Sequence, residues 1–216
     1  MNTSITFEIW GPFACWTRPE AKVERLTYPV PTPSGIRGVL SAIYSKPAEF
    51  YWQVERIEVL NPIRFISFKC NEVKTKAGRN TIIVEADRTQ RQTVALQDVR
   101  YRITASMVRR EGFSGSEVQL AEQFRRRVEG RKCFFQPSMG LRQFPAYYGW
   151  SSDAVPISED QDLGIMLYDV FDLHQWKIAK KAQPKVSLFH AHLNQGVVEI
   201  PSYDSDQVLK GGGLFA

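Results

Sequence analysis

The chain has 216 residues, of which 43% are hydrophobic and 12% aromatic, and its formal net charge is +5. This composition excludes a disordered chain and predicts one sizeable domain or two small ones. The basic excess favours a polyanionic partner over an acidic small molecule, although a charge of this size does not decide the matter alone.

The first predicted elements are a strand at residues 5–10 and an amphipathic helix within Tyr28 to Tyr44. The strand follows from strict alternation of apolar and polar residues. In the helix, Thr32 suits the N-cap and Pro33 the first helical position. Apolar residues then recur at helical spacing and define a core face: Ile36, Val39, Leu40 and Ile43.

The remaining positions of this helix allow two interpretations. Gly35 and Gly38 would let another backbone or a ligand approach the first turn closely. Arg37 could then bind an anion near the positive end of the helix, and Tyr44 would end it. The alternative is a well-capped helix that carries a surface arginine, and the sequence leaves both open.

A run of β-elements follows. Residues 54–60 and 63–68 predict two strands separated by Pro62. Residues 69–91 are polar and basic, with a short β-rich run at 81–84, and predict a projecting hairpin. The basic residues at its centre are Lys74, Lys76 and Arg79.

The second half begins with the clearest strand, at residues 99–107, where apolar and polar residues alternate. Residues 117–129 predict a second helix that ends at Gly130. Further strands are predicted in the last third of the chain, at residues 163–170, 186–193 and 197–200.

This order of elements predicts an α+β protein with a ferredoxin-like βαββαβ core, a hairpin insertion and a small β-rich carboxy-terminal part. The core would occupy residues 1–150. Residues 151–216 would form the appended subdomain.

Basic and aromatic residues alternate in two stretches, at residues 16–28 and 125–135. Such interleaving is typical of proteins that track an RNA backbone and stack its bases. A solvated helix face beside ordinary core aromatics explains either stretch equally well.

Metal-binding and catalytic patterns are scarce. His190 and His192 would share one strand face and could bind a metal if a carboxylate approached, but ordinary sheet histidines are the preferred interpretation. We assign no chemistry to the acidic residues of the same region and predict no metal and no cofactor. The absence of GxSxG and Walker motifs argues against a serine hydrolase or a P-loop enzyme.

The cysteines indicate the compartment. Cys15, Cys70 and Cys133 are widely spaced and form no CxxC pair, which suggests neither a disulfide framework nor a zinc site. The sequence shows no export signal and no apolar run of membrane-spanning length. We therefore expect a soluble, cytoplasmic protein that does not associate with membranes.

Several segments together resemble one known family. They are FEIWGPFACWTRPEAKVERLTYPVPTPSGIRGVLSAIYSKP at residues 7–47, CFFQPSMGLRQF at 133–144, LGIMLYDV at 163–170 and NQGVVEIP at 194–201. This pattern resembles the CRISPR-associated Cas5 proteins of the subtype I-C (Cas5d) branch. The resemblance covers nearly the whole chain and is weakest in the middle.

The resemblance implies a RAMP-superfamily fold with a β-hairpin thumb. It also implies a subunit that caps the 5′ handle of the CRISPR RNA in a Cascade surveillance complex for antiviral defence. The expected partners are CRISPR RNA, a backbone subunit (Cas7), a large subunit (Cas8) and, indirectly, target DNA. Members of this branch usually also cut the precursor RNA without a metal.

In this family the cut is attributed to a tyrosine at the end of the first helix and to a Lys-His pair. The pair lies shortly before a run of arginines in the second helix. Tyr44 matches the tyrosine, but Gln119 and Leu120 stand where the pair is expected. Glutamine and leucine cannot supply a base and a cation. Arg109 or Arg110 could replace them if the alignment is shifted.

We therefore expect an RNA-binding structural subunit. The alternatives are a metal-independent precursor-RNA endoribonuclease that uses Tyr44, and a nonspecific nucleic-acid binder that belongs to no complex. The expected RNA contacts are Arg18, Lys22, Arg25, Arg37, Lys74, Lys76, Arg79, Arg125, Arg126, Arg127, Arg131 and Lys132.

Overall fold

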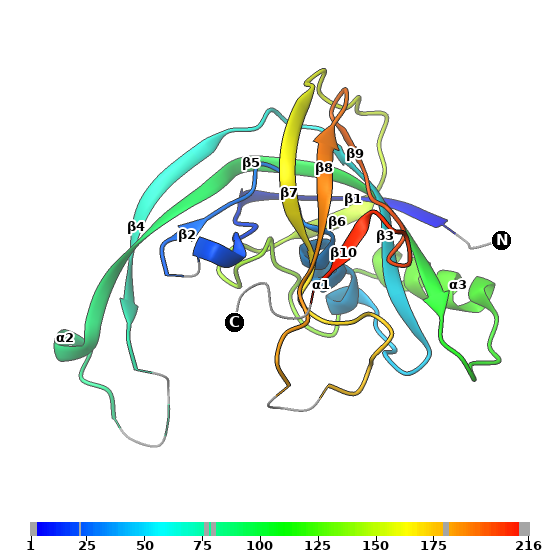
Figure 1. The fold of residues 1–216 in the computed structure, drawn as a ribbon, viewed down its shortest axis with the longest axis horizontal. Helices are drawn as coiled ribbons and strands as arrows, with labels where there is room; N and C mark the ends of the chain where they lie inside the picture. Colours follow the sequence, from blue (N-terminus) through cyan, green and yellow to red (C-terminus); the bar gives the residue numbers. More distant parts are fainter. Residues whose placement is uncertain (1–3, 22, 76–77, 79–80, 179–181, 212–216) are drawn as a thin grey trace.

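The computed structural model describes residues 4–21, 23–75, 78, 81–178 and 182–211. Figure 1 shows a strongly curved sheet that arches over α1 and extends on one side into a long hairpin. The elements in chain order are β1 (Ser4–Ala14), the 3-10 helix η1 (Pro19–Ala21), β2 (Arg25–Leu26), α1 (Pro33–Ile43), β3 (Phe50–Val59), β4 (Phe65–Val73), α2 (Val84–Asp87), β5 (Arg88–Arg109), α3 (Glu117–Glu129), β6 (Tyr147–Trp150), β7 (Gln161–Asp169), β8 (Ser187–Leu193), β9 (Val197–Glu199) and β10 (Val208–Lys210).

The main sheet confirms the predicted ferredoxin-like core. Its strands follow the order β6-β1-β5-β3-β9, and each neighbouring pair is antiparallel. Without β9, this is the order 4-1-3-2 of a βαββαβ unit whose helices are α1 and α3. The sheet therefore brings β1, near the amino terminus, between two strands from the middle of the chain.

Helix α1 forms as its sequence predicts. The Thr32 side chain accepts a hydrogen bond from Gly35 N at 3.1 Å, and Pro33 occupies the first helical position. The helix packs against β3 and β7. Its predicted core face is buried, comprising Ile36, Val39, Leu40 and Ile43.

Helix α3 has the predicted bounds and packs against β5, β6 and α1. Phe124 is fully buried and makes edge-to-face contacts with Phe7 of β1 and Trp52 of β3. Among the described residues, no helix is both long and apolar enough to span a membrane.

The predicted hairpin is present, but one of its details is wrong. Strands β4 and β5 pair from Phe65↔Leu96 to Val73↔Arg88 and form the long ribbon at the left of Figure 1. Residues 81–84 were expected to be β-structure, whereas Val84–Asp87 form the short helix α2. Ile83 and Val84 are exposed here. Because β-propensity depends on packing against neighbouring side chains, their exposure removes the stabilisation that would favour a strand. Lys76 and Arg79 lie outside the described residues.

A second sheet has the order β10-β8-β7, and its strand β7 packs against α1. All its strands come from residues 151–216, whereas β9 of the same part pairs with β3 in the main sheet. The buried Gln53 of β3 joins the two sheets, since its Nε2 donates to the hydroxyl of Tyr168 at 2.9 Å. The division of the chain at residue 150 stays a prediction.

Candidate nucleic-acid interface

A groove runs along the side of α1 that faces away from the core. Its volume is about 620 Å³. Small α1 residues form one wall, and the segment that follows α3 forms the other. The lining residues are Ser34, Gly35, Gly38, Ala42, Phe135, Gln136, Ser138, Gly140 and Arg142.

The two glycines of α1 have different roles in this groove. An added Cβ at Gly35 would meet the ring of Trp16 at 2.7 Å, so this glycine accommodates a core side chain. At Gly38 an added Cβ would meet nothing within 4 Å. The predicted close approach of a ligand is therefore possible at Gly38, whereas Trp16 already fills the space at Gly35.

Exposed cations lie at the end of α3, in the chain just before the segment that forms the second wall of the groove. We call the four residues Arg125, Arg126, Arg131 and Lys132 the α3 cluster, and all four are exposed. Within the described part of the chain, no hydrogen bond or ion pair engages their side chains. The following Phe134 and Phe135 are 56% and 62% exposed. Exposed cations are thus followed closely in the chain by exposed aromatic rings, a combination that suits a nucleic-acid strand.

Arg127 differs from the α3 cluster because its side chain is engaged in contacts within the protein. Its Nε donates to the carbonyl of Ile43 at 2.5 Å, and its guanidinium carbon lies 4.1 Å from the ring centroid of Phe134. Its contacts tie the end of α3 to the end of α1. We therefore treat Arg127 as a residue that positions the groove walls, and its contact with RNA stays a prediction.

The other predicted cations in the first part of the chain are engaged in contacts within the protein. Arg18 lies over the ring of Tyr28, 4.7 Å from its centroid. Arg25 forms an ion pair with Glu72 of β4. Lys22 lies outside the described residues.

Arg37 also has a partner within the protein. It forms an ion pair with Asp169 of β7, whose side chain is only 4% exposed. Burial lowers the pKa of Arg37 to about 10, so the guanidinium remains charged at neutral pH. The anion that the sequence analysis expected near this arginine is a carboxylate of the chain itself.

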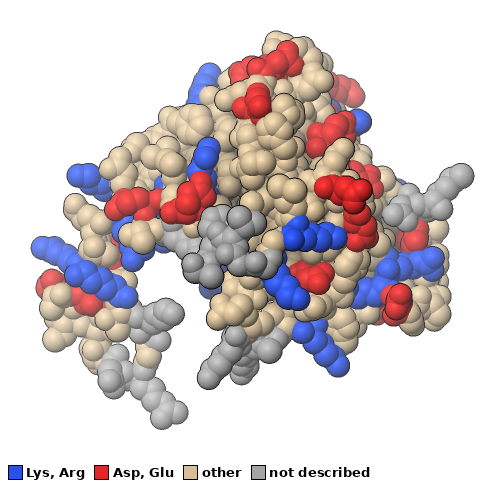
Figure 2. All heavy atoms as spheres, in the orientation of Figure 1, with Lys and Arg blue, Asp and Glu red and all other residues tan. Residues whose placement is uncertain are grey.

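In the thumb formed by β4, β5 and α2, Lys74 is exposed. A larger hollow of about 1020 Å³ lies at the base of this thumb, between residues 19–26 and the strands β4 and β5. On the face shown in Figure 2, basic and acidic side chains are intermixed. The candidate interface is thus defined by local clusters, and no single basic face dominates this view.

Tyr44 is buried at the end of α1. Its side chain packs on Phe50, with ring centroids 5.5 Å apart, and only 3% of the residue is exposed. The hydroxyl donates to Gln123 Oε1 of α3 at 2.7 Å. Burial raises the pKa of Tyr44 above its ordinary value of 10, although the nearby charge of Lys46 opposes this shift. The phenol is therefore neutral at pH 7 and is not a base.

Among the described residues, the Tyr44 hydroxyl forms no hydrogen bond with Gln119 or Leu120, the two positions aligned with the family's Lys-His pair. Gln119 is exposed, and Leu120 is a core residue that is 3% exposed. The alternative basic partners have other contacts. Arg109 Nε lies 3.0 Å from Glu117 Oε1, and Arg110 Nε donates to the carbonyl of Pro47 at 2.7 Å.

Comparison with known proteins identifies the family. The family model Cas_Cas5d, described as CRISPR-associated protein (Cas_Cas5), matches residues 4–201. The chain belongs to the Cas5d family. A Mannheimia succiniciproducens protein named CRISPR pre-crRNA endoribonuclease Cas5d is 37% identical over 232 residues, covering 96% of this chain and 99% of that protein. A Thermus thermophilus protein of the same name is 38% identical over 210 residues, covering 92% and 91%.

The fold agrees with this family. A solved structure of a CRISPR-associated protein superposes with a TM-score of 0.67 at 20% identity, covering 96% of both chains. This likeness shows a shared overall fold, and it agrees with the α+β architecture predicted for the chain.

Sequence reasoning missed two residues near the Tyr44 of this Cas5d chain. Gln123 bonds the hydroxyl, and its only sequence signal is that it lies one helical turn after Gln119, on the same face. Lys46 lies two residues after Tyr44, and its Nζ is 3.0 Å from a carboxylate oxygen of Glu49. Only the folded structure shows that Gln123 contacts the Tyr44 hydroxyl and that the charge of Lys46 acts on it.

Proposed function

We propose that this Cas5d chain binds CRISPR RNA as a subunit of a surveillance complex and caps the 5′ handle of that RNA. The observation that carries the proposal is the groove beside α1, whose second wall includes the exposed Phe135 and follows the α3 cluster and the exposed Phe134 in the chain. The family and the names of the two relatives, which refer to pre-crRNA, support RNA as the ligand.

The groove offers the contacts that a single strand requires. Arginine and lysine side chains of the α3 cluster would hold phosphates. Phe134 and Phe135 would stack on bases, which is worth about 1–3 kcal/mol per base. The bare surface at Gly38 would let the sugar–phosphate backbone lie against α1.

The proposal extends to partners and location. A Cas7-type backbone subunit and a Cas8-type large subunit would contact this chain in the cytoplasm, and target DNA would meet the complex indirectly. The contacts of Arg18, Arg25 and Lys74 with RNA are part of the same proposal. Arg25 lines the larger hollow at the thumb base. The backbone N–H of Arg18 donates to the carbonyl of Leu26, which also lines this hollow.

The proposal is tested by titrating purified protein into a labelled RNA that carries the CRISPR repeat from the same genome. We expect saturable binding that weakens as salt rises, because phosphate contacts release counterions. Equal affinity for an unrelated RNA of the same length would instead indicate the nonspecific binder.

A second candidate function is metal-independent cleavage of precursor RNA. The names of both relatives and the place of Tyr44 at the end of α1 favour it. In such a reaction the 2′-hydroxyl loses its proton to a base, for which solvent water can serve, and its oxygen attacks the adjacent phosphate. The bond to the 5′-oxygen of the next nucleotide breaks, and that oxygen takes a proton from a donor. Neutral Tyr44 could donate a hydrogen bond there, and the nearby charges of Lys46 and Arg127 could stabilise the phosphorane. The hydroxyl would first exchange its bond to Gln123 for one to RNA.

The cleavage hypothesis predicts one discrete cut in repeat RNA in the presence of EDTA, and loss of that cut in Tyr44→Phe. The substitution removes the hydroxyl but keeps the ring that packs on Phe50. Tyr147→Phe is the matched control, since Tyr147 is 53% exposed on β6. Products are separated on a denaturing gel after equal RNA binding has been shown.

The outcomes are distinct. A cut that survives Tyr44→Phe would exclude Tyr44 as the catalytic residue. A cut that is lost in Tyr44→Phe alone would contradict a purely structural role. Intact RNA with the unchanged protein, together with saturable binding, would leave RNA binding as the function.

A further inference from the structure

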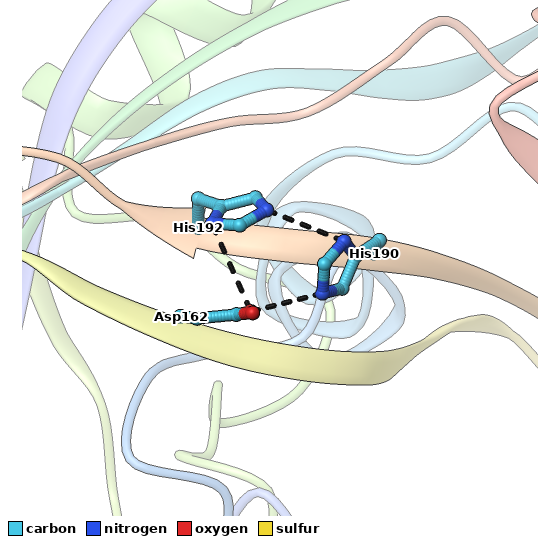
Figure 3. A group of neighbouring side chains, drawn as sticks. All are labelled: Asp162, His190 and His192. Carbon is cyan, nitrogen blue, oxygen red and sulfur yellow. Dashed lines mark hydrogen bonds and ion pairs between the residues drawn. The ribbon is translucent and has the colours of Figure 1, made fainter.

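Two histidines and an aspartate lie together on the outer face of the second sheet (Figure 3). His190 and His192 belong to β8, where buried and exposed residues alternate and both histidines are exposed. Asp162 belongs to the neighbouring strand β7 and is exposed as well. Asp162 therefore supplies the carboxylate that this histidine pair would need to bind a metal.

The distances between these groups suit a shared ligand. His190 Nε2 lies 2.9 Å and His192 Nδ1 lies 3.7 Å from Asp162 Oδ1. One ligand atom from each residue lies within 4.8 Å of the other two. Atoms that bind a tetrahedral metal at about 2.1 Å are roughly 3.4 Å from one another. Small side-chain rotations would thus bring all three onto one ion.

A β-bulge places the aspartate on this face. Ile165 pairs with His190, so strict alternation would turn Leu163 outward and Asp162 inward. The register shifts between Asp162 and Gly164, and Asp162 then pairs with His192. Gly164 accommodates the bulge with a φ of +69°, and its N–H donates to Asp162 Oδ1 at 2.9 Å.

The ligand set selects a class of metal. Two imidazoles and one carboxylate suit Zn²⁺ and its neighbours Co²⁺, Ni²⁺ and Cu²⁺, whereas Mg²⁺ and Ca²⁺ prefer oxygen ligands. Acidic side chains also gather at the top of Figure 2, the end of the molecule where β7 begins.

We propose that Asp162, His190 and His192 bind one divalent transition-metal ion, with water completing its coordination, and that this ion joins β7 to β8. Such an ion would stabilise the second sheet. The site is separate from α1, because Asp162 lies roughly 20 Å along β7 from the Asp169 that binds Arg37. Its role does not require the chain to bind or cut RNA.

The test uses full-length protein whose purification tag has been removed and which has been treated with a chelator and dialysed. Titration with Zn²⁺ in a calorimeter should show saturable binding of one ion per chain. The melting temperature should rise with Zn²⁺ concentration, because the ion binds only the folded state. Co²⁺ should give visible absorption bands from the bound ion, and Mg²⁺ should cause none of these effects.

Variants identify the ligands. His190→Ala, His192→Ala and Asp162→Asn should each abolish the one-to-one binding and the rise in melting temperature. His174→Ala is the matched control, because His174 is exposed and pairs only with Asp204 at 2.8 Å among the described carboxylates. It should leave both effects unchanged.

Three results would overturn the proposal. The first is failure of the unchanged protein to bind Zn²⁺, Co²⁺ or Ni²⁺ at micromolar concentration. The second is binding that persists in the double variant His190→Ala/His192→Ala. The third is binding of undiminished affinity in Asp162→Asn, which would mean that the histidines act without the carboxylate.

Discussion

Replacing the four residues of the α3 cluster together by alanine is expected to weaken RNA binding strongly and to flatten its dependence on salt. Each phosphate contact that is lost should reduce the slope of log affinity against log salt by about 0.7 for a single strand. The effect should be large because these side chains are exposed and unengaged within the described residues. Fluorescence anisotropy at four or more salt concentrations measures the slope.

A charge-matched control separates local contacts from net charge. A second quadruple variant replaces exposed cations outside the candidate interface, namely Arg56, Arg64, Lys177 and Lys185. Both variants lower the formal net charge from +5 to +1, since each removes four positive charges. Equal slopes in the two variants would show that overall charge, and not the α3 cluster, drives binding. Arg127 is left unchanged in both, because it holds α1 to α3.

Asp169→Ala is expected to lower the free energy of unfolding by about 3–5 kcal/mol, the usual cost of breaking a buried ion pair. The substitution leaves the guanidinium of Arg37 without its partner. It also removes the hydrogen bonds that Asp169 Oδ1 accepts from the backbone N–H groups of Val170 and Phe171. Urea unfolding followed by circular dichroism gives the free energy.

Glu199→Ala provides the matched control. Glu199 pairs with Arg56 at 2.8 Å, but both side chains are about half or more exposed. Such a surface pair contributes at most about 1 kcal/mol. If Asp169→Ala costs no more than Glu199→Ala, the Arg37 pair is not structural, and Arg37 becomes available for RNA as the sequence analysis expected.

The core of the fold could be predicted because its elements carry their own periodic signals. The cap at Thr32 and the apolar stripe of α1 predicted that helix correctly, and α3 was predicted with its observed bounds. The short strands β2, β6 and β10 were not predicted. They have two to four residues, so they show little periodicity, and they form because a neighbouring strand offers hydrogen-bond partners. The equally short β9 was predicted within residues 197–200.

The candidate site was only partly predictable. Composition identified the basic residues near α3, but it could not show which cations the protein already uses. Arg25 and Arg37 have carboxylate partners that are distant in sequence, Glu72 and Asp169. Asp162 was assigned no chemistry, because it precedes the predicted strand 163–170 and no phosphate-binding loop accompanies it. The bulge that places it beside the histidines is not visible in the sequence.

The pairing of β9 with β3 bears on how the chain folds during synthesis. Gln53 of β3 also accepts a hydrogen bond from Tyr203 N, a contact across 150 residues. The edge of the main sheet is therefore completed only after residues 197–203 have left the ribosome. Until then β3 exposes an unpaired edge to other nascent chains, which makes the partly synthesised protein prone to aggregation. Long-range pairing of this kind also slows folding, since the ends of a long loop must meet first.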